Sequence, residues 1–574
     1  MATKKPGPPR TSAPPPDTGH LFHEMQTEAA RALAADPQNV QALAQEIAST
    51  PAGDEADEAL CTLLTITLDQ ARMAQEGGQR SGKRCLDAVS HHLVDLSRKG
   101  LVTVGGNIAI TRCYVRAGLP VPAGLAPGEQ AILRETSSFL PGDETSPEAA
   151  FAKISESLLN DIGDDPSILH QAFAEILPGI PPDARSLLCK VAAANPDTRF
   201  EQLACAWLLD MSEQVRSGAL EGLTDRLAAG RLSPRALGRL AVLRSWIVDE
   251  PVRQRVDALI RNAIRSGISQ NRDTPPSHRI VRCVSSPIDG AGAQSLAIGL
   301  QKGRARAIAM VLLKQGFGVK DAYVVPCANA AEQRGLLQQV SALGGKGDVS
   351  LDYIQAALGF ALAEGRKNAV YPAPGLADVA EACALTSLRP TQDASVQAML
   401  SAYDPENALA SLDPEERETL VAASEDWPPS YPMIGHWFED NDDIFDGTDA
   451  TSTAHAHALW TWLETRRDFW ASIIARTALL LKDQGDPEAP SFAMTARAIS
   501  QGDPLQRIPV MAAIVDQTLE ARRAASFTID EGMPDGVDED IMALLMNLMA
   551  PPPQPARRPS SSKPARKGAR RKPK

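Results

Sequence analysis

Residues 212–229 read SEQVRSGALEGLTDRLAA, and this stretch decides the fold class of the chain. It is one of six consecutive candidate helices, which we place at residues 166–178, 182–194, 199–210, 212–229, 233–248 and 250–267. The segments between them are short and contain Pro, Asp or Gly, which commonly end helices. Helices joined by such short loops must lie as antiparallel neighbours. The sequence therefore predicts stacked antiparallel helical pairs over residues 143–268.

A pattern of Asp, Val-Arg, Ala and Leu occurs twice within this run. Residues 208–223 carry it in order, and Asp249-Glu250-Pro251-Val252-Arg253 begins it again, with the two Val-Arg pairs 37 residues apart. The pattern resembles a HEAT or armadillo-type helical repeat, whose period is about 40–47 residues. Over residues 166–267 the resemblance implies a solenoid in which Asp and Arg bind neighbouring turns and small residues let helices approach closely.

The segments on either side are also mainly helical. Residues 19–142 form a predicted N-terminal helical region, in which 101–121 reads as a short mixed segment with strand residues. Helices are expected again over 328–425, and 426–550 forms a Trp-containing helical domain with one long helix at about 453–483. The first 18 residues, rich in Pro, Gly, Ser and Thr, are expected to be a disordered leader.

The hydrophobic period falls towards two between residues 279 and 327, as it does in strands. Residues 280–284, 295–301, 304–314 and 322–325 are strand-like, and Lys302-Gly303 is a two-residue turn between two of them. We expect an antiparallel β-meander of three or four strands here. The predicted fold is therefore mainly α, with stacked helical pairs, a small antiparallel β-meander and disordered termini.

Charge is distributed unevenly along the chain. The formal net charge is −13, but residues 551–574 hold nine Lys or Arg and no acid, which leaves −22 on the other 550 residues. An acidic body argues against a broad nucleic-acid surface. The tail is expected to be disordered, and three roles stay open: a solubilising tail, unspecific binding of RNA, DNA or another polyanion, and membrane-surface attachment. Its candidate polyanion-binding residues are Arg557, Arg558, Lys563, Arg566, Lys567, Arg570, Arg571, Lys572 and Lys574.

The eight cysteines are widely spaced, with no Cys-x-x-Cys pair, and most stand in apolar patterns. This arrangement is typical of buried free thiols in a reducing compartment. No run of 18 apolar residues and no secretory signal is present, so we expect a cytoplasmic protein without a transmembrane segment. Neither a metal nor a cofactor is expected.

Two Gly-rich loops of the meander are the preferred place for a small-ligand site. Asp289-Gly290-Ala291-Gly292 lacks the third Gly and the following helix of a dinucleotide fingerprint, so a plain hairpin loop is the simpler reading. Loops on a rigid sheet often carry function, however. If this loop meets the one at 315–321, the polar groups at the site would be Asp289, Gln294, Lys314, Lys320 and Asp321.

Three further features have simpler explanations than a site. Gly77 to Arg84 nearly matches a phosphate-binding loop, but Arg84 replaces the required hydroxyl and a helix precedes it, so we expect a helix–helix loop. His436, His455 and His457 near the acidic loop 439–449 match no metal-binding spacing, which favours a solvated loop. Five of seven tryptophans fall between Trp427 and Trp470; we expect core positions, or an exposed docking patch beside residues 428–432.

No complete catalytic constellation is present in the sequence. We therefore expect a non-enzymatic helical-repeat scaffold that binds a protein partner, with a basic tail for unspecific polyanion contact. The alternative is an enzyme or small-ligand sensor that uses the meander loops around Asp289 and Lys320.

Overall fold

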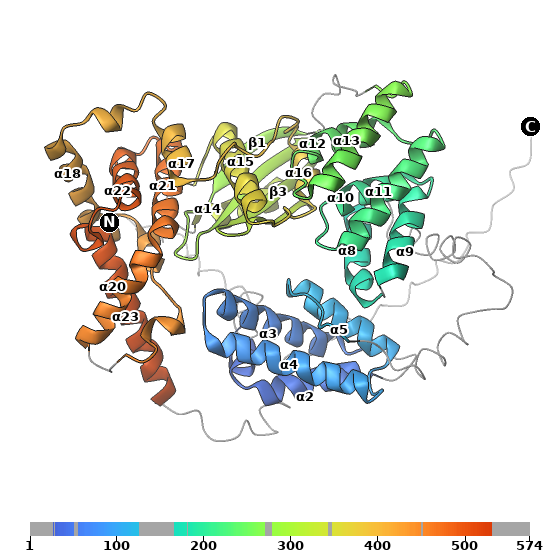
Figure 1. The fold of residues 1–574 in the computed structure, drawn as a ribbon, viewed down its shortest axis with the longest axis horizontal. Helices are drawn as coiled ribbons and strands as arrows, with labels where there is room; N and C mark the ends of the chain where they lie inside the picture. The colour runs from blue at the N-terminus through green and yellow to red at the C-terminus, as the bar shows by residue number, and fades with distance from the viewer. Residues whose placement is uncertain are drawn as a thin grey trace, which may run out of the picture.

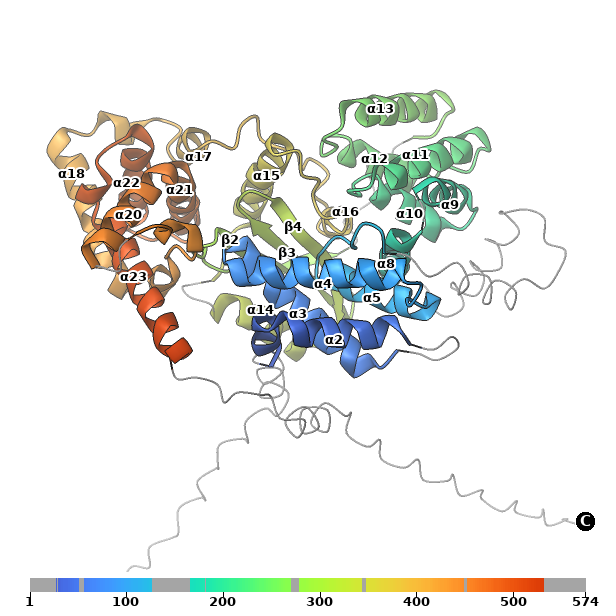
Figure 2. The ribbon, with the colours of Figure 1, turned by 60° about the horizontal axis from the view of Figure 1, so that its bottom comes forward.

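The computed structural model describes residues 27, 29–50, 56–125, 166–180, 182–269, 278–342, 347–448 and 452–530. The protein is mainly helical and has one four-stranded antiparallel sheet, with helical groups on either side of the sheet and beneath it (Figures 1 and 2). None of the helices in these ranges is both long and apolar enough to span a bilayer. The predicted leader 1–18 and basic tail 551–574 lie outside the described residues.

The N-terminal group contains α2 (Pro37–Ala48), α3 (Glu58–Glu76), α4 (Arg80–Arg98) and α5 (Val104–Arg116) around a hydrophobic core of its own. The prediction of a mixed segment at 101–121 is wrong, because α5 is a helix capped by Thr103, whose Oγ1 accepts from Gly106 N at 2.9 Å. A Cβ at Gly106 would lie within 3.0 Å of the Ala48 backbone. The glycine therefore serves close helix packing and does not mark a strand or turn.

The predicted helix stack is present. It consists of α8 (Pro166–Ile176), α9 (Pro182–Ala194), α10 (Thr198–Trp207), α11 (Glu213–Ala228), α12 (Pro234–Leu243) and α13 (Glu250–Arg265). Helices two apart in sequence pack together, since α9 and α13 contact α11 while α8 and α12 contact α10. The helices thus lie in two layers, on the right of Figure 1.

Arginines bind the turns between these helices. Arg216 Nη1 donates to Asp210 O at 2.7 Å and to Met211 O at 2.9 Å, and its Nη2 lies 3.9 Å from Asp249 Oδ2. Arg185 Nη2 donates to Ile180 O at 2.8 Å in the preceding turn. These hydrogen bonds tie the arginine side chains to the backbone of the turns.

The sheet contains β1 (Arg279–Ser285), β2 (Ala293–Lys302), β3 (Ala305–Lys314) and β4 (Gly318–Cys327) in that order, which confirms the predicted meander. Lys302 pairs with Ala305, so the turn between β2 and β3 is Gly303-Arg304, one residue later than predicted. One face packs on α14 (Ala330–Ala342), and the other packs on α15 (Leu351–Lys367) and α16 (Leu376–Ala382).

The C-terminal group contains α17 (Val396–Tyr403), α18 (Pro414–Ala422), α19 (Trp427–Ser430), α20 (Ser452–Thr465), α21 (Arg467–Asp483), α22 (Ala489–Gln501) and α23 (Pro509–Asp530). The predicted single helix at 453–483 is two helices. They are separated at Arg466, whose φ of −105° and ψ of 10° depart from helical values. The Arg466 guanidinium lies 3.6 Å from the centre of the Phe469 ring, and its Nε lies 3.2 Å from Glu439 Oε1. These contacts hold the side chain at the break.

Tryptophans fill the core of this group. Trp427, Trp437 and Trp470 are fully buried, and Trp460 and Trp462 are partly buried against the core. The Trp427 ring stacks on Phe492 with 3.5 Å between ring centres. The predicted docking patch with an exposed Trp beside residues 428–432 is therefore wrong, because burial against Phe492 removes that ring from the surface.

Candidate functional site

The two Gly-rich loops of the meander meet at one end of the sheet. Gln315 N, after β3, donates to Gly292 O, before β2, at 3.1 Å. Gly292 has a φ of +73°, and a Cβ there would lie within 3.0 Å of the Gln315 side chain. A glycine is thus required where the loops touch, and the loop contact on which the ligand-site hypothesis depended is present.

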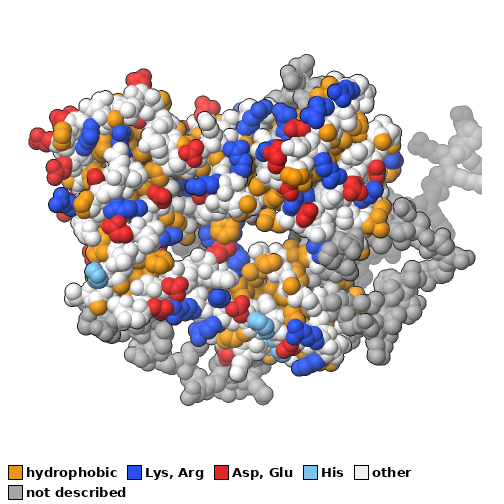
Figure 3. All heavy atoms as spheres, viewed as in Figure 1, with side chains coloured by type: hydrophobic (Ala, Val, Ile, Leu, Met, Phe, Trp, Pro, Cys, Tyr) orange, Lys and Arg blue, Asp and Glu red, His pale blue; other side chains and the backbone are white. Residues whose placement is uncertain are grey.

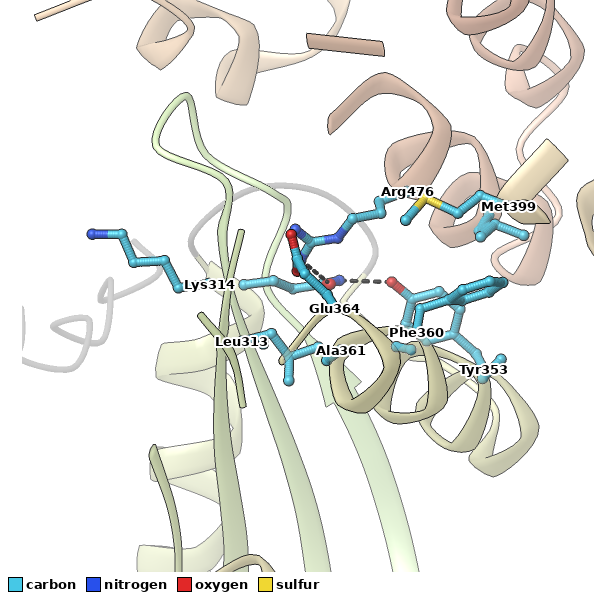
Figure 4. Close-up of a pocket in the computed structure, with 13 residues that line it drawn as sticks. Leu313, Lys314, Tyr353, Phe360, Ala361, Glu364, Met399 and Arg476 are labelled. Atoms are coloured by element: carbon cyan, nitrogen blue, oxygen red, sulfur yellow. Dashed lines mark hydrogen bonds between the residues drawn. The ribbon is translucent and has the colours of Figure 1, made fainter. Parts of the chain in front are cut away.

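Gln294 is the centre of a buried polar network behind these loops, and Tyr353 and Arg476 in Figure 4 belong to it. Its Nε2 donates to Tyr353 Oη at 2.6 Å and to Ser285 Oγ at 2.8 Å, while its Oε1 accepts from Arg476 Nη2 at 3.2 Å. Arg476 Nη1 donates to Gly292 O at 3.0 Å. The network therefore joins the sheet to α15 and α21.

Burial controls ionisation in this network. It lowers the pKa of Arg476 and raises the pKa of Tyr353 to about 12. The phenol therefore stays protonated at neutral pH and cannot serve there as a base.

A small cavity of about 50 Å³ adjoins the network, lined by residues that include Tyr353, Phe360, Glu364, Met399 and Arg476. A space of this size holds one or a few water molecules. Metabolite sites are usually about 300–1,000 Å³. The cavity as it stands thus admits water or a very small ligand.

Lys314 and Lys320 are brought together on one carboxylate, that of Glu76 at the end of α3. Lys314 forms an ion pair with Glu76, Lys320 Nζ lies 2.6 Å from Glu76 Oε2, and Arg72 Nη1 lies 2.6 Å from Glu76 Oε1. Figure 4 shows the Lys314 side chain pointing away from Arg476. These two lysines therefore attach the N-terminal helices to the sheet and do not point into the cavity.

The two predicted aspartates accept hydrogen bonds from backbone N–H groups close to them in the chain. Asp289 Oδ1 accepts from Ala293 N at 2.7 Å, and Asp321 Oδ1 accepts from Ala322 N at 2.8 Å. Burial raises the pKa of Asp321. The five predicted residues thus divide into a lysine pair on Glu76, a glutamine in the Arg476 network and two loop-stabilising aspartates.

The sequence analysis missed Glu76, Tyr353 and Arg476. One signal was available for Arg476, because this charged residue interrupts the apolar stripe of Ile473, Ile474 and Thr477. A charge inside such a stripe requires a polar partner when it is buried. Glu76 and Tyr353 carried no comparable local signal.

The segment that resembles a phosphate loop is a helix–helix turn, as predicted, and it contacts the acidic loop. Asp442 Oδ2 accepts from Arg80 N at 2.8 Å at the start of α4, and Arg80 Nη2 donates to Asp443 Oδ1 at 2.8 Å. Arg80 also pairs with Asp446, and Gln79 donates to Asp440. Asp442, Asp443 and Asp446 are exposed, as the prediction of a solvated loop requires, and they also contact α4, because the free N–H groups and partial positive charge of a helix N-terminus attract carboxylates.

A hollow of about 430 Å³ lies beside this contact, lined by residues that include Ala34, Met73, Ala74, Ser81 and Asp440. Burial raises the pKa of Asp440. Within the described ranges, no three His, Cys, Asp or Glu side chains converge as metal ligands would, His436, His455 and His457 included.

Charged contacts thus fasten the N-terminal helices to the rest of the chain at three places. The first is Glu76 with Lys314 and Lys320, and the second is Arg80 with the acidic loop. The third is Glu175 of α8, whose two oxygens lie 2.9 Å from Arg112 Nε and 2.8 Å from Arg116 Nε.

Replacing Glu76 by Gln is expected to lower the urea midpoint of unfolding at pH 7. Burial alone would raise the pKa of Glu76, but hydrogen bonds from Lys314, Lys320 and Arg72 lower it to about 2, against an ordinary 4.5. A carboxyl whose pKa is lowered by folding stabilises the protein above its unfolded pKa, and this contribution disappears as the pH falls through the folded pKa.

The difference in urea midpoint between the wild type and E76Q should therefore be largest above about pH 4.5 and should disappear towards about pH 2. Urea midpoints measured across this range check the prediction. Glu46→Gln, at an exposed position on α2, is the matched control and should change the midpoint little. A gap that does not vary with pH would contradict the assigned role of Glu76.

The predicted polyanion-binding residues, from Arg557 to Lys574, all lie outside the described residues.

Three segments of the chain match family models. Residues 7–122 match the uncharacterised protein y4lR N-terminal domain, 181–267 match the Y4lR second domain, and 397–523 match the Y4lR C-terminal helical domain. Over 504 residues the chain is 29% identical to the uncharacterized protein y4lR of Sinorhizobium fredii (strain NBRC 101917 / NGR234), covering 85% of this chain and 93% of that protein. No solved structure matches the chain. The chain is thus similar to y4lR along most of its length.

Proposed function

We propose that the protein is a non-enzymatic scaffold of HEAT-like helical repeats that binds a protein partner, while its basic tail makes unspecific contacts with a polyanion. One observation carries this proposal: the N-terminal helices have their own hydrophobic core and are attached to the body by ion pairs and by the packing of α5 on α8. A unit attached in this way can move without exposing a core.

The attachment at Arg80 is exposed and therefore weak, whereas the carboxylates of the other two attachments, Glu76 and Glu175, are 15% and 9% exposed. Solvent-exposed ion pairs, such as Arg80 with Asp443, each contribute about 0–1 kcal/mol and are screened by salt. A partner that offers competing charges or apolar area can displace them. The neighbouring helix stack offers the extended surface on which repeat proteins bind partners.

The distribution of charged side chains on the body favours a protein partner over a nucleic acid. Figure 3 shows Lys and Arg side chains interspersed with Asp and Glu on the face in view, without one continuous basic area. Nucleic-acid surfaces concentrate basic side chains on one face. The nine basic residues of the tail are the part of the chain suited to a polyanion.

We propose the cytoplasm as the compartment. Seven of the eight cysteines are buried, Cys61 is partly exposed, and all eight are free thiols. Thiols persist in this form where cellular reductants keep them reduced.

The test is affinity capture with two chains of equal length, the wild type and a variant with the nine basic tail residues changed to Gln. Both are used at about 50 and 200 mM salt, with and without nuclease. We expect the same protein partner on both chains after nuclease treatment. Nucleic acid should be recovered only by the wild type and only at low salt. Failure to enrich one protein at a fixed stoichiometry would overturn the scaffold, and salt-insensitive nucleic acid on the variant would overturn the role of the tail.

A small-ligand sensor is the second candidate, and the Arg476 cavity favours it. Arg476 hydrogen-bonds two neutral oxygens and forms no ion pair with any carboxylate among the described residues. A desolvated cation lining a cavity is suited to a small carboxylate. The melting temperature of the wild type would then rise with millimolar acetate or formate at constant ionic strength, and that of Arg476→Gln would not. Equal responses of the two proteins would remove this candidate.

A further inference from the structure

Cys61 differs from the other cysteines in its exposure. It lies on α3 and is partly exposed, whereas the remaining seven thiols are buried. Its neighbour across the helix pair is Cys113 of α5, which is 1% exposed. Cys113 Sγ donates to Cys61 O at 3.4 Å, where α3 and α5 pack together. A partly exposed cysteine and a buried one thus lie against each other between two helices.

The surroundings favour the thiolate at Cys61 and the thiol at Cys113. The hydrogen bond from Cys113 is the main cause that lowers the pKa of Cys61, and the positive charges of Arg112 and Arg116 add to it. The same contact and burial raise the pKa of Cys113. For comparison, burial raises the pKa of Cys85, in the same hydrophobic core, to about 11.

We propose that Cys61 and Cys113 form a redox-active dithiol, in which Cys61 reacts with a peroxide and Cys113 resolves the product. The Cys61 thiolate attacks one peroxide oxygen, the O–O bond breaks, and hydroxide or alkoxide leaves and takes up a proton. Cys61 is oxidised to the sulfenic acid as the peroxide is reduced. The Cys113 sulfur then attacks the Cys61 sulfur, and water leaves with the Cys113 proton. A disulfide between α3 and α5 results, and a dithiol reductant restores both thiols.

This inference does not depend on the proposed scaffold function. The two arginines beside Cys61 are those that bind Glu175 of α8. The dithiol therefore lies beside one of the three attachments of the N-terminal helices.

The test treats the reduced full-length protein with hydrogen peroxide, alkylates the remaining thiols and maps them by peptide mass spectrometry. We expect a Cys61–Cys113 disulfide that accounts for two lost thiols and is reversed by dithiothreitol. Cys113→Ser should stop the reaction at the sulfenic acid, which dimedone traps on Cys61. Cys61→Ser should keep Cys113 reduced, and Cys85→Ser, the matched control, should react like the wild type.

Alkylation without oxidant provides an independent measurement. At pH 7 Cys61 should react at least about tenfold faster than Cys85, because Cys61 is partly exposed and its pKa is lowered, whereas Cys85 is buried and its pKa is raised to about 11. Comparable rates for the two thiols would overturn the proposal. So would an oxidised protein in which Cys61 and Cys113 both remain open to alkylation after unfolding.

Discussion

Replacing Glu201 by alanine is expected to destabilise the helix stack by about 3–5 kcal/mol, because it removes the ion-pair partner of the buried Arg226. Glu201 of α10 and Arg226 of α11 are 2% and 1% exposed, and Arg226 Nε lies 3.4 Å from Glu201 Oε1. Ser233, which caps α12, donates to the same carboxylate through its N at 2.8 Å and its Oγ at 2.6 Å. One carboxylate thus joins three consecutive helices.

Hydrogen exchange measured on peptides from residues 182–269 of the full chain checks this effect. It reports the opening free energy of the stack separately from other parts of the protein. Glu201→Gln keeps an acceptor for Ser233 without the charge, so its effect should be smaller, at about 1–3 kcal/mol. Asp95→Ala removes the exposed pair between Asp95 and Arg98, whose Nη1 lies 3.1 Å from Asp95 Oδ1, and should cost less than about 1 kcal/mol. Equal effects of E201A and D95A would refute the role assigned to Glu201.

The sequence predicted the parts of the fold that depend on local pattern. The helix stack followed from the short loops between residues 166 and 267, and the meander followed from the change of period at 279. The prediction failed at α5, where strand residues suggested a mixed segment although the chain is helical and Gly106 allows close contact with α2. It also failed at Arg466, where a contact with Glu439, 27 residues earlier in the chain, accompanies a break in an otherwise continuous helical pattern. Both failures come from contacts between segments far apart in the chain.

Contacts between distant parts of the chain also limited the prediction of the candidate site. The meeting of the two meander loops could be predicted, because a meander places alternate turns at the same end of the sheet. The partners of those loops could not, since Glu76 stands 238 residues before Lys314 and Arg476 stands 182 residues after Gln294. The contact of Arg80 with Asp443 of the acidic loop spans 363 residues. Pattern and spacing carry no information about such pairs.

Replacing Gly222 by alanine is expected to destabilise the stack by about 1–3 kcal/mol, although alanine normally favours helices. Gly218 and Gly222 lie one turn apart on the face of α11 that packs on α9. A Cβ at Gly222 would lie within 3.0 Å of Lys190 O and Ala193 Cβ, and one at Gly218 would lie equally close to Ser186 O. The carbonyl oxygens belong to the α9 backbone and cannot move without displacing that helix.

The same substitution at Gly238 is the control, because a Cβ on that residue of α12 meets nothing within 4 Å. Gly238→Ala should therefore stabilise the stack by up to about 1 kcal/mol, through helix propensity alone. Hydrogen exchange on the peptides of α9 and α11 measures both variants. The two alanines should shift the opening free energy in opposite directions, since one adds strain between two helices and the other only restricts the unfolded chain. If G222A proved as stabilising as G238A, α9 and α11 would not be held at the separation that the structure shows.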